Sequence, residues 1–421
     1  MFQIIRDAWK IPELRKKMLF TLLMLAVFRL GTFIPVPGLN SAALQQLVAD
    51  GSSLFALMDS FSGGAFSNAT IFAMSITPYI NSSIIMQLLA VAIPALERIS
   101  KDGEEGRKKI ASWTRYVTII LAIIQATGLY FGIEGAVENP GVLSFITIVA
   151  TFTAGTAFLM WLGEKITENG VGNGISMIIF AGILAGMPGL VGDLYRNFAA
   201  GMLSIWALIA IALIAIAMVV FVVFINDAER RIPVQYAKRM VGRKMYGGQS
   251  THIPIKVSMS GVMPIIFAMS IMAFPSTLIN LFGAPTGGFW LKFLNFISPT
   301  SWFYIVFYLL LIVFFTYFYT AIQFNPIEIA NNMKKNGGFV PGIRPGKPTS
   351  EYVARILSKI TLTGALFLGV VAAVPLVLGK VIGFSISIGG TSLLIMVGVA
   401  LETVKQIESQ MLMRHYKGFL E

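Results

Sequence analysis

The sequence predicts an all-α polytopic membrane protein whose ten transmembrane helices form two inverted five-helix halves. Hydrophobic residues make up 56% of the 421 positions and charged residues only 12%. A single soluble core could not bury this much apolar surface, so lipid must cover the remainder. Two further observations support this fold class: a series of long apolar runs, and the uneven distribution of basic residues between them.

Nine apolar runs are each long enough to cross about 30 Å of hydrocarbon as a helix. They lie at residues 71–93, 114–133, 143–163, 173–192, 203–225, 258–281, 301–324, 357–379 and 384–401. A tenth run, from Met18 to about Ile34, contains Arg29 and follows a basic stretch, a pattern that a cleaved signal peptide also shows. We favour a retained helix, because apolar residues continue beyond Arg29 and no small-residue cleavage site follows at the usual distance.

The basic residues predict the orientation. With the N-terminus inside, 28 of the 32 Lys and Arg residues lie on the inner side, Arg29 lies within a span, and three lie outside, namely Arg196, Lys292 and Lys380. Basic residues favour the cytoplasmic side, so both termini are expected there.

The predicted parts of the chain are an N-terminal tail 1–17, a first half 18–192, a second half 203–404 with inner loops 226–257 and 325–356, and a C-terminal tail 405–421. Two five-helix halves are antiparallel, as in an inverted repeat.

Several classes of function are disfavoured by residues that the sequence lacks. There is no cysteine and there are only two histidines, so neither a disulfide framework nor a His- or Cys-rich metal site is expected. No HExxH or phosphate-loop motif occurs, so we expect neither an enzyme nor a bound cofactor. An ion-coupled secondary transporter of a small solute is the alternative, but no acidic residue lies near the centre of a span, where such proteins usually hold one. A scaffold without a pathway is the third possibility.

The first outer loop contains a short amphipathic segment. In SSLFALMDSFSGGAF, four apolar side chains recur at helical spacing, namely Leu54, Leu57, Met58 and Phe61, and the pattern ends at Gly63 and Gly64. A helix of about ten residues is too short to cross a bilayer. It therefore lies at the membrane interface or folds back into a cavity of the protein.

Two inner loops combine stiffness with positive charge. The stretch GGFVPGIRPGKP at 337–348 places Arg344 and Lys347 among glycines and prolines, which favour tight turns and a fixed backbone shape. In the preceding inner loop, IPVQYA and THIPIK flank Gly247 and Gly248 and predict an extended hairpin. Its tip carries the basic residues Arg239, Arg243 and Lys244. Positive-inside topology requires the charge but not the fixed shape, so these loops are predicted to contact a partner.

Several ordered motifs resemble the SecY family, the central subunits of the bacterial Sec protein-translocation channel. They are RLGTFIPVPG at 29–38, MDSFSGGAFSNATIFAMSITPYINSSIIMQLL at 58–89, GEEGRKKI at 103–110, MWLGEKITENGVGNGIS at 160–176, QSTHIPIKV at 249–257, FNPIEIANNMKKNGGFVPGIRPG at 324–346 and GGTSLLI at 389–395. The resemblance covers nearly the whole chain. It implies a passive conduit for unfolded polypeptide in the bacterial plasma membrane, gated by partners.

The resemblance also assigns residues. It implies a pore ring of isoleucines, namely Ile76, Ile80, Ile175, Ile179, Ile266 and Ile395, and a plug at about 54–66. It implies a lateral gate for signal sequences and membrane segments, with candidate lining residues Asn81, Gln87, Gln125, Ser258 and Phe274. The two basic loops would be docking surfaces for the SecA ATPase and the ribosome, and the small subunits SecE and SecG would surround the chain.

Overall fold

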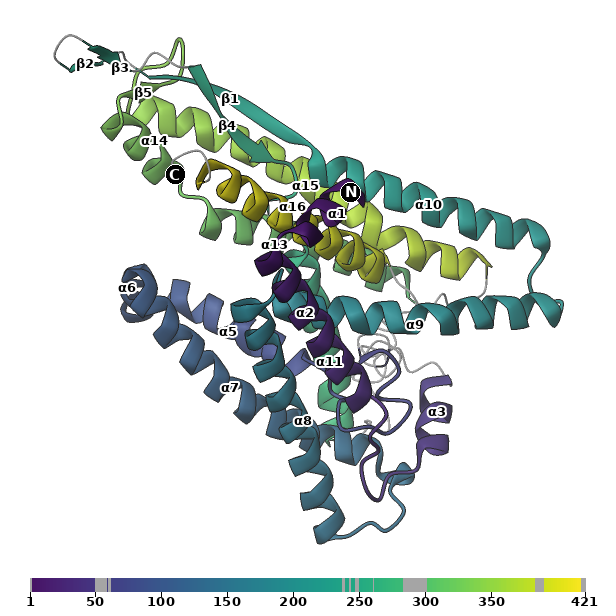
Figure 1. Ribbon diagram of the computed structural model, residues 1–421. Helices are drawn as coiled ribbons and strands as arrows, with labels where there is room; N and C mark the ends of the chain where they lie inside the picture. The colour runs from purple at the N-terminus through teal and green to yellow at the C-terminus, as the bar shows by residue number, and fades with distance from the viewer. Residues whose placement is uncertain are drawn as a thin grey trace.

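The protein is mostly helical (Figure 1). A computed structural model describes residues 2–49, 59, 62–236, 239–241, 244–246, 250–259, 261–282, 301–382 and 390–417. The helices are α1 (Phe2–Lys10), α2 (Pro12–Gly31), α3 (Ser41–Ala49), α5 (Thr77–Ala92), α6 (Pro94–Lys101), α7 (Gly103–Gly132), η1 (Glu134–Ala136), α8 (Val142–Asn169), α9 (Gly174–Ala199), α10 (Ile205–Asp227), α11 (Met263–Phe282), α13 (Trp302–Gln323), α14 (Pro326–Lys335), α15 (Lys347–Ile382) and α16 (Gly390–Lys417).

Each apolar run of the sequence overlaps one of these helices. Among the described residues, six helices are long and apolar enough to cross a membrane, or seven if the bent pair α5 and α6 forms one span. The bend of 104° between α5 and α6 falls at Pro94, which cannot donate a backbone hydrogen bond. The α2 helix is less apolar than these helices, because its first turns contain Glu13 and three basic residues. The chain is therefore a multi-span membrane protein.

The run expected to span from residue 71 begins with turns, and α5 starts only at Thr77. Ala69 and Ser75 adopt φ of 52°, a left-handed conformation that breaks a helix, and Pro78 lies in the first turn of α5, where proline is tolerated. Backbone hydrogen bonds to residues 34–36 support the non-helical stretch, from Val36 N to Ala69 O at 2.8 Å and from Ile71 N to Ile34 O at 3.1 Å. We call residues 62–76 the turn segment.

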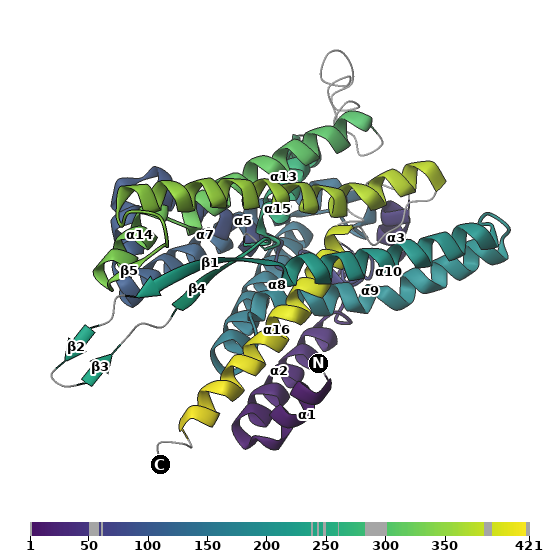
Figure 2. The same ribbon diagram turned by 90° about the horizontal axis from the view of Figure 1, so that it is seen from above.

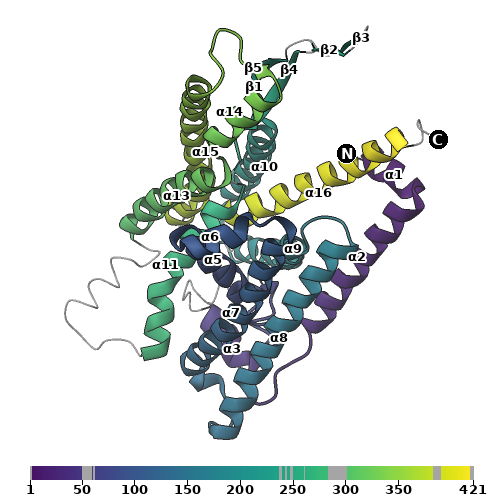
Figure 3. The same cartoon turned by 90° about the vertical axis from the view of Figure 1, so that its left-hand side faces the viewer.

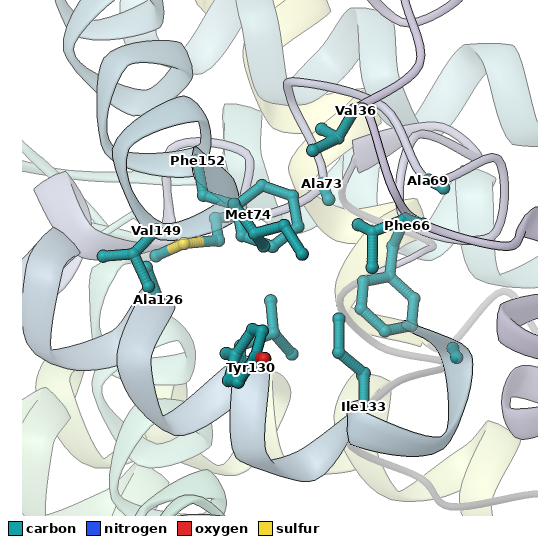
Figure 4. Close-up of a cluster of buried hydrophobic side chains, with 14 of the residues drawn as sticks. Val36, Phe66, Ala69, Ala73, Met74, Ala126, Tyr130, Ile133, Val149 and Phe152 are labelled. Carbon is teal, nitrogen blue, oxygen red and sulfur yellow. The ribbon is translucent and has the colours of Figure 1, made fainter. Parts of the chain in front are cut away.

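The turn segment lies within the hydrophobic core. In Figure 4, Phe66 extends toward Ile133, which follows α7, and Met74 lies beside Val149 and Phe152 of α8. A buried cluster of 17 residues joins Phe66, Ala69, Ala73 and Met74 to Val36. On α8, Gly155 permits a close approach, because a Cβ there would lie 2.0 Å from the carbonyl oxygen of Ile71. Backbone this irregular is tolerated at membrane depth only when protein covers it.

The helices form two groups, which Figure 3 shows one above the other. The N-terminal group contains α2 and α5–α8, and the C-terminal group contains α10, α13, α15 and α16. Three helices connect the groups: α9 contacts both α8 and α16, α11 contacts both α7 and α13, and α1 packs on α16. The two groups therefore share an interior boundary that α5, α9, α11 and α16 line.

The described parts of the loops at 226–257 and 325–356 form one compact unit beyond the long helices (Figure 2). Strand β1 (Glu229–Tyr236) pairs antiparallel with β4 (Ser250–Lys256), which confirms the predicted hairpin, and β2 (Arg239–Val241) pairs with β3 (Lys244–Tyr246) near its tip. The second loop supplies β5 (Gly338–Phe339), which pairs with the other edge of β1. We call the unit of β1, β4, α14 and β5, together with the loop 340–346 that follows β5, the loop platform.

Substituting Gly155 tests the packing of the turn segment. We expect Gly155→Ala to lower the thermal unfolding temperature of the purified protein in detergent, because overpacking a fixed backbone contact costs about 1–3 kcal/mol. Gly186→Ala on α9 is the matched control, since its Cβ meets nothing within 4 Å, and it should leave the temperature unchanged or raise it. Equal temperatures for the two variants would contradict the close contact.

Candidate functional site

Aliphatic side chains from three helices meet at the boundary between the two groups. Ile179 and Ile183 of α9 and Ile395 and Val399 of α16 are buried together, and Ile80 of α5 and Ile175 of α9 pack against them. We call Ile80, Ile175, Ile179 and Ile395 the isoleucine cluster. Ile175 and Ile179 lie one helical turn apart and so share a face of α9.

The other two predicted ring residues lie in adjoining clusters. Ile76 is buried in a cluster against which Ile80 and Ile175 also pack. Ile266 of α11 packs against a cluster of the C-terminal group, and Ile80 packs there too. All six isoleucines are therefore connected through shared neighbours. Because aliphatic side chains stiff at χ1 offer no hydrogen bond, this region can seal a narrow passage without holding a polar solute.

Local contacts fix the start of α9, which supplies two members of the isoleucine cluster. The Asn173 side chain caps this helix by accepting hydrogen bonds from the backbone N–H groups of Ile175 and Ser176 at 3.1 and 3.3 Å. A Cβ on Gly163 would lie 2.5 Å from the Cδ1 atom of Ile175, so a glycine in α8 makes room for this side chain. The cap and the close approach set the direction of Ile175.

The predicted plug lies partly outside the described residues, which exclude Leu54, Leu57, Met58 and Phe61. Gly63 and Gly64 are described and adopt φ of 67° and 84°, the left-handed conformation typical after a helix end. A Cβ on Gly63 would lie 2.8 Å from the carbonyl oxygen of Gly182 on α9. Gly182 is three residues beyond Ile179, so the end of the predicted plug lies one turn from the isoleucine cluster.

The predicted gate residues lie on or near helices that contact one another, because α7 contacts both α5 and α11. Asn81 on α5 has a buried Oδ1 atom with no partner in the described part of the chain. The Nε2 atom of Gln87 donates to Ser83 Oγ at 3.2 Å, and Gln125 is half-buried on α7. The Phe274 side chain lies outside the described residues.

Ser258 lies just before α11, in the wall of a cavity of about 420 Å³ between the hairpin and the C-terminal group. This wall also includes the charged residues Lys256, Glu402 and Lys405 and the apolar residues Val222, Phe367 and Leu394. Lys405 forms an ion pair with Asp227 at 2.5 Å. The structure therefore places Ser258 in a cavity with both charged and apolar walls, next to the hairpin.

Two polar groups at the boundary were missed from the sequence. Ser82 is buried and its hydroxyl donates to the carbonyl oxygen of Thr114 at 2.8 Å, which joins α5 to α7. Tyr308 of α13 is buried in a cluster with Ile84 of α5, and its hydroxyl has no partner among the described residues. The sequence signal for Tyr308 was weak, because it lies in a run of aromatic and aliphatic residues.

The loop platform holds Arg344 at an exposed, fixed position. The Thr349 hydroxyl donates to the carbonyl oxygen of Arg344 at 2.8 Å, and the flanking Gly342 and Gly346 adopt φ of 80° and 107°. Val340, four residues earlier, is buried in a cluster with residues of β1, β4, α14 and α15. Lys347 is exposed at the start of α15. The loop is therefore anchored on the sheet, and Arg344 within it is exposed.

The basic tip of the hairpin is described only in part. Arg239 lies in β2 and Lys244 lies in β3, where Lys244 pairs with Val241, but their side chains are outside the described residues. Arg243 lies outside the described residues altogether. The backbone shows that both strands extend beyond the sheet of β4, β1 and β5 (Figure 2).

Comparisons with known proteins agree on one family. A sequence model of the SecY family matches residues 70–404. The chain is 49% identical to the protein translocase subunit SecY of Halalkalibacterium halodurans, over 100% of both chains. The chain is also similar to a solved SecY structure, with a TM-score of 0.68, 20% identity and 96% of each chain covered. That structure is described as showing that the plug domain of SecY stabilises the closed state of the translocation channel. Sec61 in the canine ribosome-channel complex is similar with a TM-score of 0.61, 19% identity and 96% of each chain covered.

Removing the Tyr308 hydroxyl tests whether a buried group lacks a partner at the boundary. We expect Tyr308→Phe to raise the thermal unfolding temperature, because an unpaired buried hydroxyl costs about 1–3 kcal/mol. Tyr317→Phe on the same helix is the matched control, since its hydroxyl donates to the carbonyl oxygen of Ser358 at 3.3 Å. A larger loss of stability for Tyr308→Phe than for Tyr317→Phe would show that the hydroxyl has a partner.

Proposed function

The chain belongs to the SecY family, and from this premise we propose that it conducts unfolded secretory polypeptides across the bacterial plasma membrane and releases membrane segments laterally into lipid. It is a protein-conducting channel in the membrane. The observation that supports the mechanism best is the meeting of isoleucines from α5, α9 and α16 between the two helix groups. The alternative of a solute transporter gains no support from the family.

The proposed pathway runs between two inverted halves of five spans each, with both termini cytoplasmic. The first half ends with α9, and the second half begins with α10. A ring formed by the isoleucine cluster with Ile76 and Ile266 would close around a passing chain. Isoleucine suits this role, because a narrow apolar constriction dewets and thereby blocks ions, while it presents no hydrogen-bonding group on which an unfolded chain could be retained.

The proposed lateral gate lies where α5 and α7 face α11 and α13. The polar groups on its α5 and α7 side are the half-buried amide of Gln125 and the Asn81 side-chain oxygen, which has no hydrogen-bond partner among the residues that the structure describes. A signal helix can shift such an equilibrium only by its differential affinity for the open state. A gate held closed by a few marginal contacts is therefore one that a signal helix can open.

The proposed energy source is a partner, with the loop platform as its docking surface. A planar guanidinium such as that of Arg344 forms paired hydrogen bonds with carboxylates or phosphates, so it can contact either a SecA motor or ribosomal RNA. Binding to a ribosome is supported by the likeness to the ribosome-bound Sec61 channel. SecE and SecG are proposed to cover exposed apolar faces of the helices, as lipid does elsewhere.

Widening the isoleucine ring should make the channel leak. We expect Ile80→Ser combined with Ile179→Ser to raise ion conductance in planar bilayers several-fold, because smaller polar side chains let water fill the constriction. The matched control is Ile123→Ser on α7, an exposed residue, which should conduct like the native chain. Native conductance in the double variant would contradict the ring.

Reversing the charge of Arg344 should abolish docking of the motor. The measurement is protease protection of a signal-bearing precursor in proteoliposomes that contain this chain with SecE, with SecA and ATP added. We expect ATP-dependent protection with the native chain and at least a tenfold loss with Arg344→Glu, because a carboxylate repels the acidic partner group that a guanidinium binds.

The control for this experiment is Arg355→Glu, which makes the same charge change at an exposed site on α15. This variant should retain protection. Full protection with Arg344→Glu would remove the docking assignment, and equal losses in both variants would point to net charge alone. No protection even with the native chain and active partners would contradict the conduit itself.

A further inference from the structure

The cavity that Ser258 lines belongs to neither the proposed ring nor the proposed docking surface. It has a volume of about 420 Å³ and is lined by residues of β4, α10, α15 and α16 and by Phe324, which follows α13. This volume falls within the range typical of pockets that hold small ligands. The chemistry of its walls therefore indicates what kind of molecule fits.

The lining residues of two helices change from apolar to polar along the chain. On α16, Leu394 and Glu402 both line the cavity and lie about two turns apart on one side of the helix. On α10, Val222 and Asn226 line it about one turn apart. In each helix the apolar residue comes first, and the polar residue lies nearer the C-terminal end.

The polar ends of these two helices meet at the cavity, and so do their apolar parts. Lys405 of α16 lines the cavity and forms an ion pair with Asp227 of α10 at 2.5 Å. Val222 and Leu394 belong to one buried cluster, together with Phe367 of α15. The cavity is therefore charged at one end and apolar at the other.

The apolar end lies close to the surface that meets lipid. Phe367 packs edge-on against Phe221 of α10, with ring centroids 5.1 Å apart. Phe221 is exposed, and its neighbours Val220 and Phe224 on α10 are more exposed still. In a multi-span membrane protein such an apolar face meets hydrocarbon. The apolar end of the cavity therefore lies within one aromatic side chain of the bilayer.

The charged end has one cation and one anion without an ion pair in the described part of the chain. They are Lys256 of β4 and Glu402 of α16. The residue opposite Lys256 on β1 is Glu229, which pairs with Arg231 at 2.7 Å. Lys405 is already paired with Asp227. A polar group that carries one negative and one positive charge therefore complements this end of the cavity.

A simpler explanation is that the cavity holds only water. Water would hydrate Lys256 and Glu402, both of which are exposed. It gains nothing at the apolar end, where Val222, Phe367 and Leu394 present hydrocarbon, because apolar surface is more stable against hydrocarbon than against water. An amphiphile with a zwitterionic polar group satisfies both ends at once.

We propose that the cavity binds a phospholipid whose headgroup carries a primary amine, with the phosphate at Lys256, the ammonium at Glu402 and the start of an acyl chain at the apolar end. A primary ammonium donates hydrogen bonds to a carboxylate, whereas the quaternary ammonium of a choline headgroup has no N–H to donate. A headgroup with a phosphate alone leaves Glu402 without a partner and places a second negative charge near it. The site therefore prefers phosphatidylethanolamine to phosphatidylcholine and phosphatidylglycerol.

The site adjoins the proposed pathway without belonging to it. Val262 lines the cavity and also packs against the cluster that contains Ile179 and Ile395. A ligand that binds only the folded protein stabilises it, so a bound lipid supports the packing of the C-terminal group behind that cluster. Lipid binding at this position does not depend on the conduction of a polypeptide.

Native mass spectrometry of the purified full chain in detergent measures the preference, with phosphatidylethanolamine, phosphatidylcholine and phosphatidylglycerol of equal acyl length added separately. We expect the native chain to bind phosphatidylethanolamine about fivefold more tightly than the other two. Equal affinities for the three lipids would overturn the proposal. O-phosphoethanolamine carries both charges without hydrocarbon and should not displace the lipid at equal concentration. Displacement would show that the site takes a soluble phosphate and not a lipid.

Two neutral variants separate the contacts of the headgroup. Glu402→Gln removes the partner of the ammonium, and we expect it to bind phosphatidylethanolamine no more tightly than phosphatidylcholine. Lys256→Gln removes the partner of the phosphate and should weaken the binding of both lipids by similar factors. The matched controls are Glu408→Gln on α16 and Lys359→Gln on α15, which make the same changes at exposed positions outside the cavity and should bind like the native chain. A native preference in Glu402→Gln, or an equal loss in Glu408→Gln, would contradict the site.

Filling the cavity tests its apolar part without a change of charge. Gly398 lines the cavity between Leu394 and Glu402, and a Cβ there would meet only the Cγ2 atom of Val262, at an ordinary contact distance of 3.7 Å. We expect Gly398→Leu to fold and to lose the preference, while Gly186→Leu on α9, where a Cβ meets nothing within 4 Å, keeps it. If Glu402→Gln fails to fold, Gly398→Leu decides the matter, and a native preference there would overturn the proposal.

These measurements contain no precursor, SecA or ATP, so they are independent of the proposed function. Equal lipid affinities together with ATP-dependent protection of a precursor would remove the lipid site and leave the conduit standing. A clear preference for phosphatidylethanolamine without any protection would remove the conduit and leave the lipid site standing.

Discussion

The need to satisfy backbone polar groups inside the bundle governs this structure. Residues 63–76 form turns and not a regular helix at the level of the membrane helices, so some of their N–H and C=O groups have no partner in a helical ladder and lipid could not pair them. Protein must surround them instead. The stretch at 34–36 forms backbone bonds to this segment, Gly155 admits the Ile71 carbonyl, and Gly182 lies against Gly63. Each glycine lets a helix approach an irregular backbone, and the approach positions the helices that meet at the isoleucine cluster.

The interior boundary combines tight and loose contacts. Near the turn segment, side chains such as Phe66, Phe152 and Met74 are buried and closely packed. Between the two groups, Asn81 and Tyr308 each bury a polar atom that has no partner within the described residues. Such groups lower the stability of the closed arrangement by more than their hydrogen bonds would have contributed. The packing between the two groups is therefore less stable than it would be if both polar atoms had partners.

Much of the fold could be predicted from the sequence because its signals are local. Apolar runs predict the helices, and IPVQYA and THIPIK predicted the hairpin that β1 and β4 form. The spacing of Ile175 and Ile179 predicted a shared face, although only family resemblance could relate them to Ile395, more than 200 residues away. The pairing of β5 with β1, the start of α5 at Thr77 and the contact of Arg29 with Gly63 depend on tertiary packing, which local propensity does not contain.

The loop platform and the interior boundary share a structural element. The α15 helix begins at Lys347, three residues after Arg344, and runs for 36 residues. Its first turns pack on the platform through Val353 and Leu357, and its later turns pack through Phe367, Leu368 and Val371 into the cluster that contains Ile84 of α5. A continuous helix transmits displacement along its axis better than a loop does. The α15 helix therefore connects the loop that carries Arg344 to the cluster that contains Ile84 of α5, the helix that also carries Ile80 and Asn81.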